Sequence, residues 1–524
     1  MATISKSYSL LPVPDKLDFD KSRHLLQRCV FGPKKSEIDA LVGQSISSAI
    51  STLMALPTTT TQPVNNDARD LAVGLGQSWV STSYNSTYNP YRINSLRAWW
   101  IGNMVTQPAT IFEKMVLFWH NHFVTEISVV NNAHYSYQYI QVLRNYALGN
   151  IKKMVYDITI NPAVLVYLNG NANVVGAPNE NFGRELFELF TIGKGPLIAA
   201  GNYTNYTESD IREAAKVLTG WTINATTLTG VYNTSRHDKT TKTFSAAFSN
   251  QTIANKEVDE YKLLIDMIFS KKETARYLVR KIYRWLMYYT IDKDVEDQII
   301  EPLATTLFDN NYEIKPVLIQ LLGSDHFFSQ DFRGAYIKNP LDFSIGIFRK
   351  CEIPMSTDLM ANYGIWTYIF NSVVNMEMTL GDPPDVAGWP QYYKEPLFNE
   401  LWVNSSTVPN RTSFSNVMSL GGVTYNGFKY VIDPFLLIPK ISNPGDPIAL
   451  ITGLTQILLP VSISSAKQSA LKEILIPGLP DTSWTSEWIK YAGNPADATQ
   501  KNLIRTKLLA VIAAILRMPE FYLS

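Results

Sequence analysis

The stretch YRINSLRAWWIGNMVTQPATIFEKMVLFWHNHFV, residues 91–124, indicates the fold class of this chain. Its apolar residues recur at the three- and four-residue spacing of one helix face, and Pro108 divides the pattern into two helices. The same period returns over 258–322 and again from Pro447 to the C-terminus. These patterns predict a mainly α fold.

Toward the N-terminus, 20–42 predicts two helices separated by a break at Gly32-Pro33, because glycine and proline both interrupt helical backbone. Further along, TESD places Thr207 and Asp210 three residues apart. In that arrangement a helix-capping side chain and the third helical residue exchange hydrogen bonds. We expect a helix to begin there.

Two stretches lack helical period and are rich in Ser, Thr, Asn and Gly, about 222–250 and 404–427. We expect them to be irregular inserts containing short strands. Between them, DPPDVAGWP (382–390) predicts a rigid turn, since three prolines and a glycine exclude regular structure. No segment divides the chain, so the expected architecture is one large multi-helical unit over 1–524.

The 46 basic and 46 acidic side chains balance, so the chain lacks the basic footprint of a nucleic-acid binder. The longest apolar run, LLAVIAAILRMPEF (508–521), is too short for a membrane span and contains Arg517. The N-terminus shows no charged region followed by an apolar one, so no signal peptide is visible. We expect a soluble chain without a membrane span or nucleic-acid partner, and with Cys29 and Cys351 as free buried thiols.

The motif FWHNHF, 118–123, places two of the six histidines two residues apart. If the helix continues through Phe123, His120 and His122 lie about 200° apart around its axis and cannot meet at one metal ion. If the chain extends after Phe118, alternate side chains point the same way and the pair can chelate. The β-branched segment VTEISVV that follows favours extended backbone. Both geometries stay open, as does a core histidine held by hydrogen bonds.

The stretch PNENFGRELFELFTIGKG, 178–195, has the apolar period of a helix. Glu180, Arg184 and Glu188 fall four residues apart on a second face, which is also the pattern of a solvated ion-pair ladder. Glu185 lies at the border of the apolar face, and a carboxylate there is costly unless a cation or a metal ion neutralises it. Glu180, in the first turn, also suits the helix N-terminus.

The stretch SRHDKTTKTF, 235–244, lies inside the first insert. A His-Asp pair on a loop over a rigid scaffold, here His237 and Asp238, is a common arrangement for a general base and the carboxylate that orients it. The same residue types form ordinary turns, so both interpretations stay open.

Eight motifs, taken together and in this order, resemble those of a large bacterial family known as domain of unknown function 1800. They are HLLQRCVFG (24–32), EKMVLFWHNHF (113–123), PNENFGRELFELFTIG (178–193), YTESDIREAAKVLTGW (206–221), RHDKTTKTF (236–244), KNPLDF (338–343), PPDVAGWP (383–390) and WVNSSTVPNR (402–411). The resemblance runs from about His24 to the closing MPEFYLS and covers nearly the whole chain.

The resemblance implies an exported bacterial protein without an established activity, although the missing signal peptide leaves the compartment open. In this chain Phe190 stands where many members carry His, and Lys239-Thr240-Thr241 replaces the glycine that usually follows the His-Asp pair. The histidine and acidic motifs of the family map onto His120, His122, Glu180, Arg184, Glu185, His237 and Asp238.

The first functional hypothesis is a metal-dependent or acid–base hydrolase. A divalent metal such as zinc or iron would be held by His120, His122 and Glu180, with Glu185 as the other candidate carboxylate. The bound water would then attack an ester, amide or glycosidic bond. The residues expected to carry catalysis are Arg184, Glu185, His237 and Asp238.

The second hypothesis is a non-catalytic structural or binding component of a surface or secreted assembly. The many tyrosines and asparagines and the Ser/Thr/Asn-rich inserts suit contact with carbohydrate or protein. The His and Glu side chains would then form buried polar networks. The chain has no GxGxxG after a strand, no GxxxxGK[ST] and no GxSxG motif, which disfavours nucleotide and serine-hydrolase chemistry.

Overall fold

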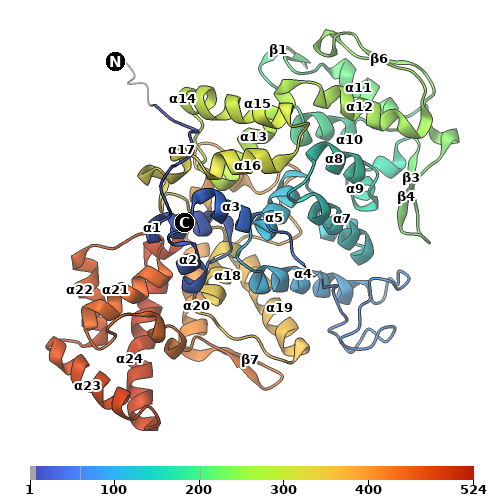
Figure 1. Ribbon diagram of the computed structural model, residues 1–524. Helices are drawn as coiled ribbons and strands as arrows, with labels where there is room; N and C mark the ends of the chain where they lie inside the picture. Colours follow the sequence, from blue (N-terminus) through green and yellow to red (C-terminus); the bar gives the residue numbers. More distant parts are fainter. Residues whose placement is uncertain (1–6, 59–60, 201) are drawn as a thin grey trace.

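Helices build most of the regular structure in the computed structural model, which describes residues 7–58, 61–200 and 202–524 (Figure 1). The first half contains α1 (Phe19–Cys29), α2 (Lys35–Leu41), α3 (Ile46–Leu53), α4 (Asn89–Thr106), α5 (Phe112–His122), α6 (Ile127–Val130), α7 (Ala133–Tyr146), α8 (Ile151–Thr159), α9 (Pro162–Tyr167), α10 (Glu180–Glu185) and α11 (Glu208–Val217). The second half contains α12 (Glu260–Phe269), α13 (Lys272–Leu286), α14 (Lys293–Val295), α15 (Glu301–Asp309), α16 (Ile314–Leu322), α17 (Asp325–Phe328), α18 (Pro340–Lys350), α19 (Leu359–Asn375), α20 (Thr407–Asn416), α21 (Pro447–Leu458), α22 (Ser465–Leu475), α23 (Asp481–Gly493) and α24 (Ala498–Leu516). The predicted mainly α fold is confirmed.

The strands are short, and every sheet among the described residues is a two-stranded antiparallel pair. The pairs are β1 (Leu197–Ala199) with β2 (Asn202–Tyr203), β3 (Trp221–Asn224) with β4 (Thr229–Tyr232), β5 (Lys242–Thr243) with β6 (Thr252–Ile253), and β7 (Val423–Tyr425) with β8 (Phe428–Tyr430). The strands β3, β4 and β5 lie in the first insert, where short strands were expected, and β6 follows directly after it.

The second insert is only partly irregular. A short strand was expected there and β7 is present, paired with β8 just beyond the insert, but α20 replaces the irregular backbone predicted for the residues before it. The side-chain oxygen of Asn404 accepts hydrogen bonds from the backbone N–H groups of Ser406 and Thr407, at 2.8 and 2.9 Å, and so supports the first turn. Phe414 is buried on one face of the helix. These hydrogen bonds at the start of the helix and one buried face outweigh the weak helix propensity of Ser, Thr and Asn.

Two predicted chain features are present. The capping box of α11 forms between Thr207 and Asp210. The break between α1 and α2 contains Gly32, whose φ is +65°, and a Cβ on it would lie 2.3 Å from the Cα of Gly346 in α18. Glycine is therefore required where these two parts of the chain touch.

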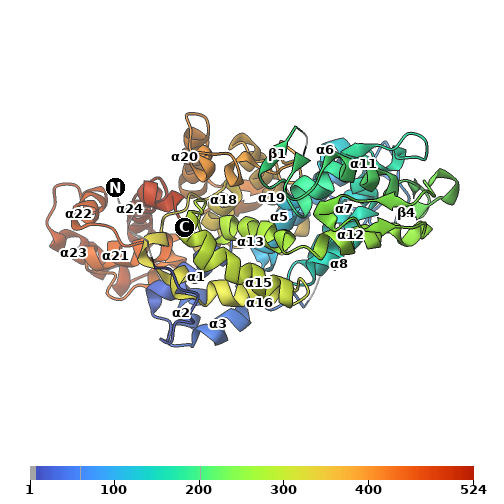
Figure 2. The same cartoon turned by 90° about the horizontal axis from the view of Figure 1, so that it is seen from above.

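One continuous cluster of buried apolar side chains extends from Leu17 to Tyr522. The molecule is elongated, with the C-terminal helices α21 to α24 at one end and the β3–β4 hairpin at the other (Figure 2).

Cys29 and Cys351 are free and buried, and burial raises the pKa of each thiol to about 12. Within the described residues, no helix has the length and apolar character needed to cross a membrane.

Candidate functional site

Helix α5 carries both histidines of FWHNHF and stays helical through His122. Since residues two apart on a helix point about 200° apart, the two imidazoles face different surroundings. The His120 ring packs against Trp100 and Tyr139, at centroid distances of 5.2 and 6.2 Å. The Nε2 atom of His122 instead lies 3.0 Å from the carbonyl oxygen of Phe190. Of the two geometries left open by the sequence, the helical one is present.

The expected metal ligands do not converge. Glu180 pairs with Arg184 at 3.3 Å, and both ring nitrogens of His120 are buried without a partner in the described part of the chain. Across 7–58, 61–200 and 202–524, no group of three or more His, Cys, Asp or Glu side chains is placed to hold a metal ion. The set of His120, His122 and Glu180 therefore does not fit a zinc or iron ion.

Burial keeps the two imidazoles neutral. It lowers the pKa of His120 to about 4. It lowers the pKa of His122 to about 3, and the charge of Lys281 acts in the same direction. Neither histidine changes its charge near neutral pH, which is the range in which a histidine general base normally works.

The acidic motif begins as α10 and continues as a π-helical turn, Leu186–Phe190. Asn179 caps the helix, because its side-chain oxygen accepts a hydrogen bond from the backbone N–H of Asn181 at 3.0 Å. Phe187 is buried beneath the turn. A π-turn inserts an extra residue into a helix and occurs frequently at functional sites. The acidic residues of the motif thus lie beside a local irregularity that the apolar period did not indicate.

Arg184 is surrounded by carboxylates. Its two terminal nitrogens each lie 2.7 Å from a carboxylate oxygen of Glu208 on α11, and Glu180 and Glu188 are 3.3 and 3.6 Å away. Two-point pairing of this kind fixes the planar guanidinium group firmly. Arg184 therefore connects α10 to α11 and positions these acids.

Glu185 differs from its neighbours, because it is half-buried and has no hydrogen-bond or ion-pair partner among the residues that the structure describes. Burial, followed by the charge of Glu188, raises the pKa of this carboxyl to about 7. Asp385 acts in the same direction, and the opposing effect of Arg184 is smaller than that of Glu188. A carboxyl that is half protonated near neutral pH can both donate and accept a proton. We refer to Glu185, Glu188 and Asp385 as the acidic cluster.

The DPPDVAGWP turn, which carries Asp385, packs against α5. The backbone N–H of Trp389 donates a hydrogen bond to the side-chain oxygen of Asn121 at 2.8 Å. Gly388 has a φ of +95°, and a Cβ on it would lie 2.5 Å from the carbonyl oxygen of Asn121, so the contact requires glycine. Asp385 itself is exposed and accepts a hydrogen bond from the backbone N–H of Ala387 at 2.8 Å.

A lysine of α13 lies next to this turn. The Lys281 amine is 5.4 Å from the ring centroid of Tyr277 and 5.9 Å from that of Tyr393. Burial lowers its pKa to about 8. A hollow of about 10 Å³ separates Lys281 from His122 and Ala387, and it has room for about one water molecule. The Tyr277 hydroxyl donates a hydrogen bond to the carbonyl oxygen of Leu189, in the π-helical turn that follows α10, at 3.0 Å.

The expected pairing of His237 with Asp238 is wrong. His237 Nε2 lies 3.0 Å from a carboxylate oxygen of Glu260, and the other oxygen of Glu260 lies 2.7 Å from the Lys242 amine. All three side chains are fully buried. Although burial acts to raise it, hydrogen bonds from His237 and Lys242 lower the pKa of Glu260. The carboxylate of Asp238 accepts hydrogen bonds from its own turn instead, so this part of the insert is a packed ionic network.

The motif 118–123 on α5 contacts two other motifs of the sequence, 178–195 and 382–390. A family model described as "Protein of unknown function (DUF1800)" matches residues 24–523. The chain belongs to this family. No curated protein and no solved structure matches the chain.

In this DUF1800 member, the sequence identified Glu185 through its position at the border of an apolar face but missed two neighbours. Asp385 stood in a motif whose prolines indicated only a turn. Lys281 follows the ordinary helical period of α13, and nothing in the sequence distinguishes it from the other lysines. The ring of Phe190 packs against the ring of Phe123, with a centroid distance of 5.5 Å, while the Phe190 carbonyl is the partner of His122.

Proposed function

We propose that this DUF1800 protein is an acid–base enzyme of the hydrolase type, in which Glu185 transfers the proton. The state of this one side chain carries the proposal: it is half-buried, unpaired within the described residues, and close to two further carboxylates. A carboxyl kept in that environment is costly for a purely structural residue. Perturbed carboxyls of this kind concentrate at functional sites.

The chemistry uses the chain's own residues. With a pKa of about 7, Glu185 can protonate the leaving group of an ester, amide or glycosidic bond, or take a proton from the attacking water. Lys281 has a pKa of about 8 and is mostly charged at neutral pH. Its amine is therefore suited to stabilise negative charge that develops in the transition state. Asp385 supplies a second carboxylate at the exposed side of the cluster.

A non-catalytic structural or binding role is the second candidate. The burial of His120, His122 and His237 favours it, because two of these histidines hydrogen-bond within the fold. The polar groups would then fix helix packing, while the surface contacts carbohydrate or protein. The two candidates differ in what they require of Glu185.

The test compares two variants of the same helix. Glu185→Gln removes the titrating carboxyl with little change of shape, and Glu180→Gln removes an ion-paired carboxylate of the same helix as the matched control. We would assay p-nitrophenyl esters, p-nitrophenyl glycosides and casein between about pH 5 and 9. The rate should follow an apparent pKa near 7, and Glu185→Gln should lower kcat/KM by about 100-fold or more.

Glu180→Gln should leave kcat/KM within about twofold, because surface ion pairs contribute little. Equal rates in the two variants, or no cleavage of any of these substrates by the unmodified protein, would support the non-catalytic candidate.

A further inference from the structure

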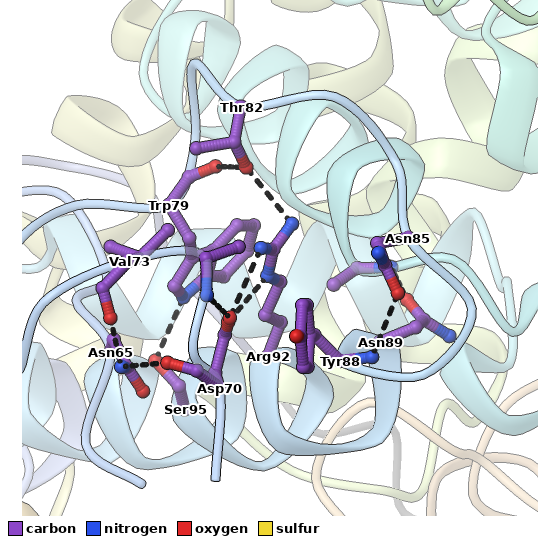
Figure 3. A network of polar contacts seen from close by, with 12 residues as sticks. Asn65, Asp70, Val73, Trp79, Thr82, Asn85, Tyr88, Asn89, Arg92 and Ser95 are labelled. Atoms are coloured by element: carbon purple, nitrogen blue, oxygen red, sulfur yellow. Dashed lines mark hydrogen bonds and ion pairs between the residues drawn. The ribbon is translucent and has the colours of Figure 1, made fainter. Parts of the chain in front are cut away.

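Most buried basic side chains of this protein have a carboxylate partner. In the network shown in Figure 3, Arg92 of α4 lies 2.8 Å from the carboxylate of Asp70, and both side chains are buried. A charge taken out of water is costly unless such a partner is present. Across the described residues, the buried basic side chains that pair with a carboxylate are Arg23, Arg92, Lys114, Arg144, Lys242 and Arg349. Those that have no carboxylate partner there are Arg28, Lys338, Lys350 and Arg411.

Two of these exceptions, the lysines, lie against the segment 519–524, which we call the C-terminal segment. The Lys338 amine donates a hydrogen bond to the carbonyl oxygen of Phe521 at 2.5 Å and lies 4.4 Å from the centroid of its ring. The Lys350 amine is 5.7 Å from the same centroid. Lys338, Lys350 and Phe521 are only 3%, 1% and 0% exposed. Both amines are therefore enclosed together with the ring that the segment contributes to the core.

The two arginines complete the surroundings of this segment. The guanidinium carbon of Arg411 lies 5.3 Å from the ring centroid of Tyr522. That of Arg28 lies 5.0 Å from the ring centroid of Tyr336, the residue whose backbone pairs with the end of the segment. Four side chains that can carry positive charge thus surround one short stretch of chain.

The C-terminal segment is attached to 336–338 by a short antiparallel bridge. The backbone N–H of Lys338 donates a hydrogen bond to the carbonyl of Tyr522, and that of Ser524 donates one to the carbonyl of Tyr336, both at 2.8 Å. A contact with few backbone hydrogen bonds can open locally without unfolding of the rest. Whether the segment stays in place therefore depends strongly on the buried side chains around it.

Lys338 lacks a free counter-ion. Burial lowers its pKa from the usual 10.5 to about 7, and the charges of Arg411 and Lys114 act in the same direction. The opposing charge is that of Asp342, whose carboxylate already pairs with Lys114. A protonated Lys338 would therefore be a buried charge among other positive charges.

Lys350 has the same difficulty. Burial lowers its pKa well below the usual value, and the charges of Lys338 and Arg23 act in the same direction. The neighbouring thiol of Cys351 has a pKa of about 12 and supplies no negative charge near neutral pH. The Lys350 amine donates a hydrogen bond to the carbonyl oxygen of Leu458 at 2.6 Å, a contact that an uncharged amine can also make.

Three stretches that the acidic cluster does not use meet at this place. Lys338 is the first residue of KNPLDF (338–343), and Arg411 is the last residue of WVNSSTVPNR (402–411). The third is the closing MPEFYLS, which contains the C-terminal segment. The Arg411 guanidinium donates a hydrogen bond to the carbonyl of Lys338 at 2.9 Å and so connects the first two.

We propose that the C-terminal segment is a pH-dependent latch, which is seated in the core while Lys338 and Lys350 are uncharged and is released when they take up protons. Release lets water reach both ammonium groups, which removes the cost of their burial. The inference does not rest on the proposed hydrolase activity, because neither lysine belongs to the acidic cluster.

The latch has a defined response to pH. A lysine that is neutral in the seated state and charged in the released state binds one proton on release. Between its two pKa values, the equilibrium constant for release then rises up to about tenfold for each unit by which pH falls, and up to about a hundredfold for two lysines. The range from about pH 8.5 to 7.5 lies above the titration of the histidines and of Glu185, so these groups do not contribute there.

The experiment measures hydrogen–deuterium exchange of the full-length protein by mass spectrometry at about pH 8.5 and 7.5, with correction for the intrinsic exchange rate. The N–H groups of Lys338 and Ser524 report directly, because both donate in the bridge. We expect the opening constant of peptides that contain them to rise about tenfold or more at the lower pH. Peptides of α4 should show no such change. An equal rise in α4 would mean that the whole molecule opens, which overturns the proposal.

Variants then assign the response to the two amines. Lys338→Met and Lys350→Met should each lower the pH response by up to about tenfold, since each removes one titrating group and keeps an apolar stem. Lys490→Met, at an exposed position of α23, should keep the full response. Melting temperatures show which variants fold, and either lysine variant decides if the other does not fold. Exchange at the bridge that does not depend on pH, or a response unchanged in the lysine variants, overturns the proposal.

Discussion

Glu185 is the residue through which pH acts most directly on the proposed site. Its folded-state pKa is about 7 against an ordinary value of 4.5. Between these values the folded state binds more protons than the unfolded state, so the free energy of unfolding falls as pH rises from 4.5 to about 7. Above that window the loss is about 2 kcal/mol, after discounting for the partial exposure of the group.

Glu185→Gln should therefore stabilise the protein at about pH 8, by about 2 kcal/mol, and change little at about pH 5. Urea unfolding at both pH values measures this, with Glu180→Gln as the control that should show neither effect. A destabilised Glu185→Gln at the higher pH would mean that the carboxylate holds the fold together and would favour the non-catalytic candidate.

The two histidines of α5 allow a matched comparison. His120→Phe removes two unpaired ring nitrogens from an aromatic environment, so stability should stay within about 1 kcal/mol of the wild type. His122→Phe leaves the Phe190 carbonyl without its partner and should cost about 1–3 kcal/mol. Thermal unfolding measures both, and an equally large loss in the two variants would contradict the separate environments of these rings.

At this scale the sequence could indicate which residues are unusual but not which of them meet. Glu185 was recognisable because it lies at the border of an apolar helix face, and this border can be read from the sequence of a single segment. The partner of His237 was not recognisable, since Glu260 lies on another helix and only tertiary packing brings the two side chains to 3.0 Å.

Among the elements, the 382–390 turn depends on close contact with α5. Gly388→Ala adds a Cβ 2.5 Å from the Asn121 carbonyl oxygen at a φ of +95°, and we expect it to cost more than about 3 kcal/mol from clash and backbone strain together. The control is Gly427→Ala, which has a φ of +78° but no neighbouring atom within 4 Å.

Gly427→Ala should cost about 1 kcal/mol, because strain acts there without a clash. Melting temperatures give the difference between the two variants. Equal losses of stability in the two variants would show that the turn can move away from α5 without destabilising the fold.

The helices themselves were largely predictable, because an apolar face with a period near 3.6 residues is a local property. Two elements were not. The π-helical turn Leu186–Phe190 has the same apolar spacing as an α-helix over so few residues. Helix α20 is built from residues that favour turns, and it forms because Asn404 accepts hydrogen bonds from the backbone N–H groups at its start and Phe414 is buried on its inner side.

For the whole molecule, buried neutral histidines should govern acid unfolding. Burial lowers the pKa to about 3 for His24 and His122 and to about 4 for His120 and His326, from the usual 6.5. The unfolded chain then takes up protons first, so stability is lost as pH falls from 6.5 toward about 3. Glu185 changes the stability in the opposite direction, but it is a single group, whereas four histidines act together.

Circular dichroism between about pH 7 and 3 should therefore show cooperative loss of helix, accompanied by net proton uptake. A free energy of unfolding that stays constant between pH 6.5 and about 4 would contradict the neutral burial of these rings.

The buried apolar side chains form one core, as expected for a sequence without a dividing linker. A cavity of about 610 Å³ between α4 and α19, in contrast, could not be predicted from the sequence. Its walls come from α4 and α19, about 250 positions apart in the chain, and each helix shows only an ordinary apolar face. Cavities arise from the imperfect fit between elements, and sequence period describes each element by itself.

The two cysteines give the molecule an internal reporter. Cys29 is the last residue of α1, shortly before Gly32, and Cys351 directly follows α18, the helix that contains Gly346. A thiol with a pKa of about 12 is almost entirely protonated and reacts slowly with disulfide reagents or maleimides. Both sulfurs are fully buried, so alkylation at either one requires the surrounding core to open first, and the labelling rate measures how often the intact protein does so.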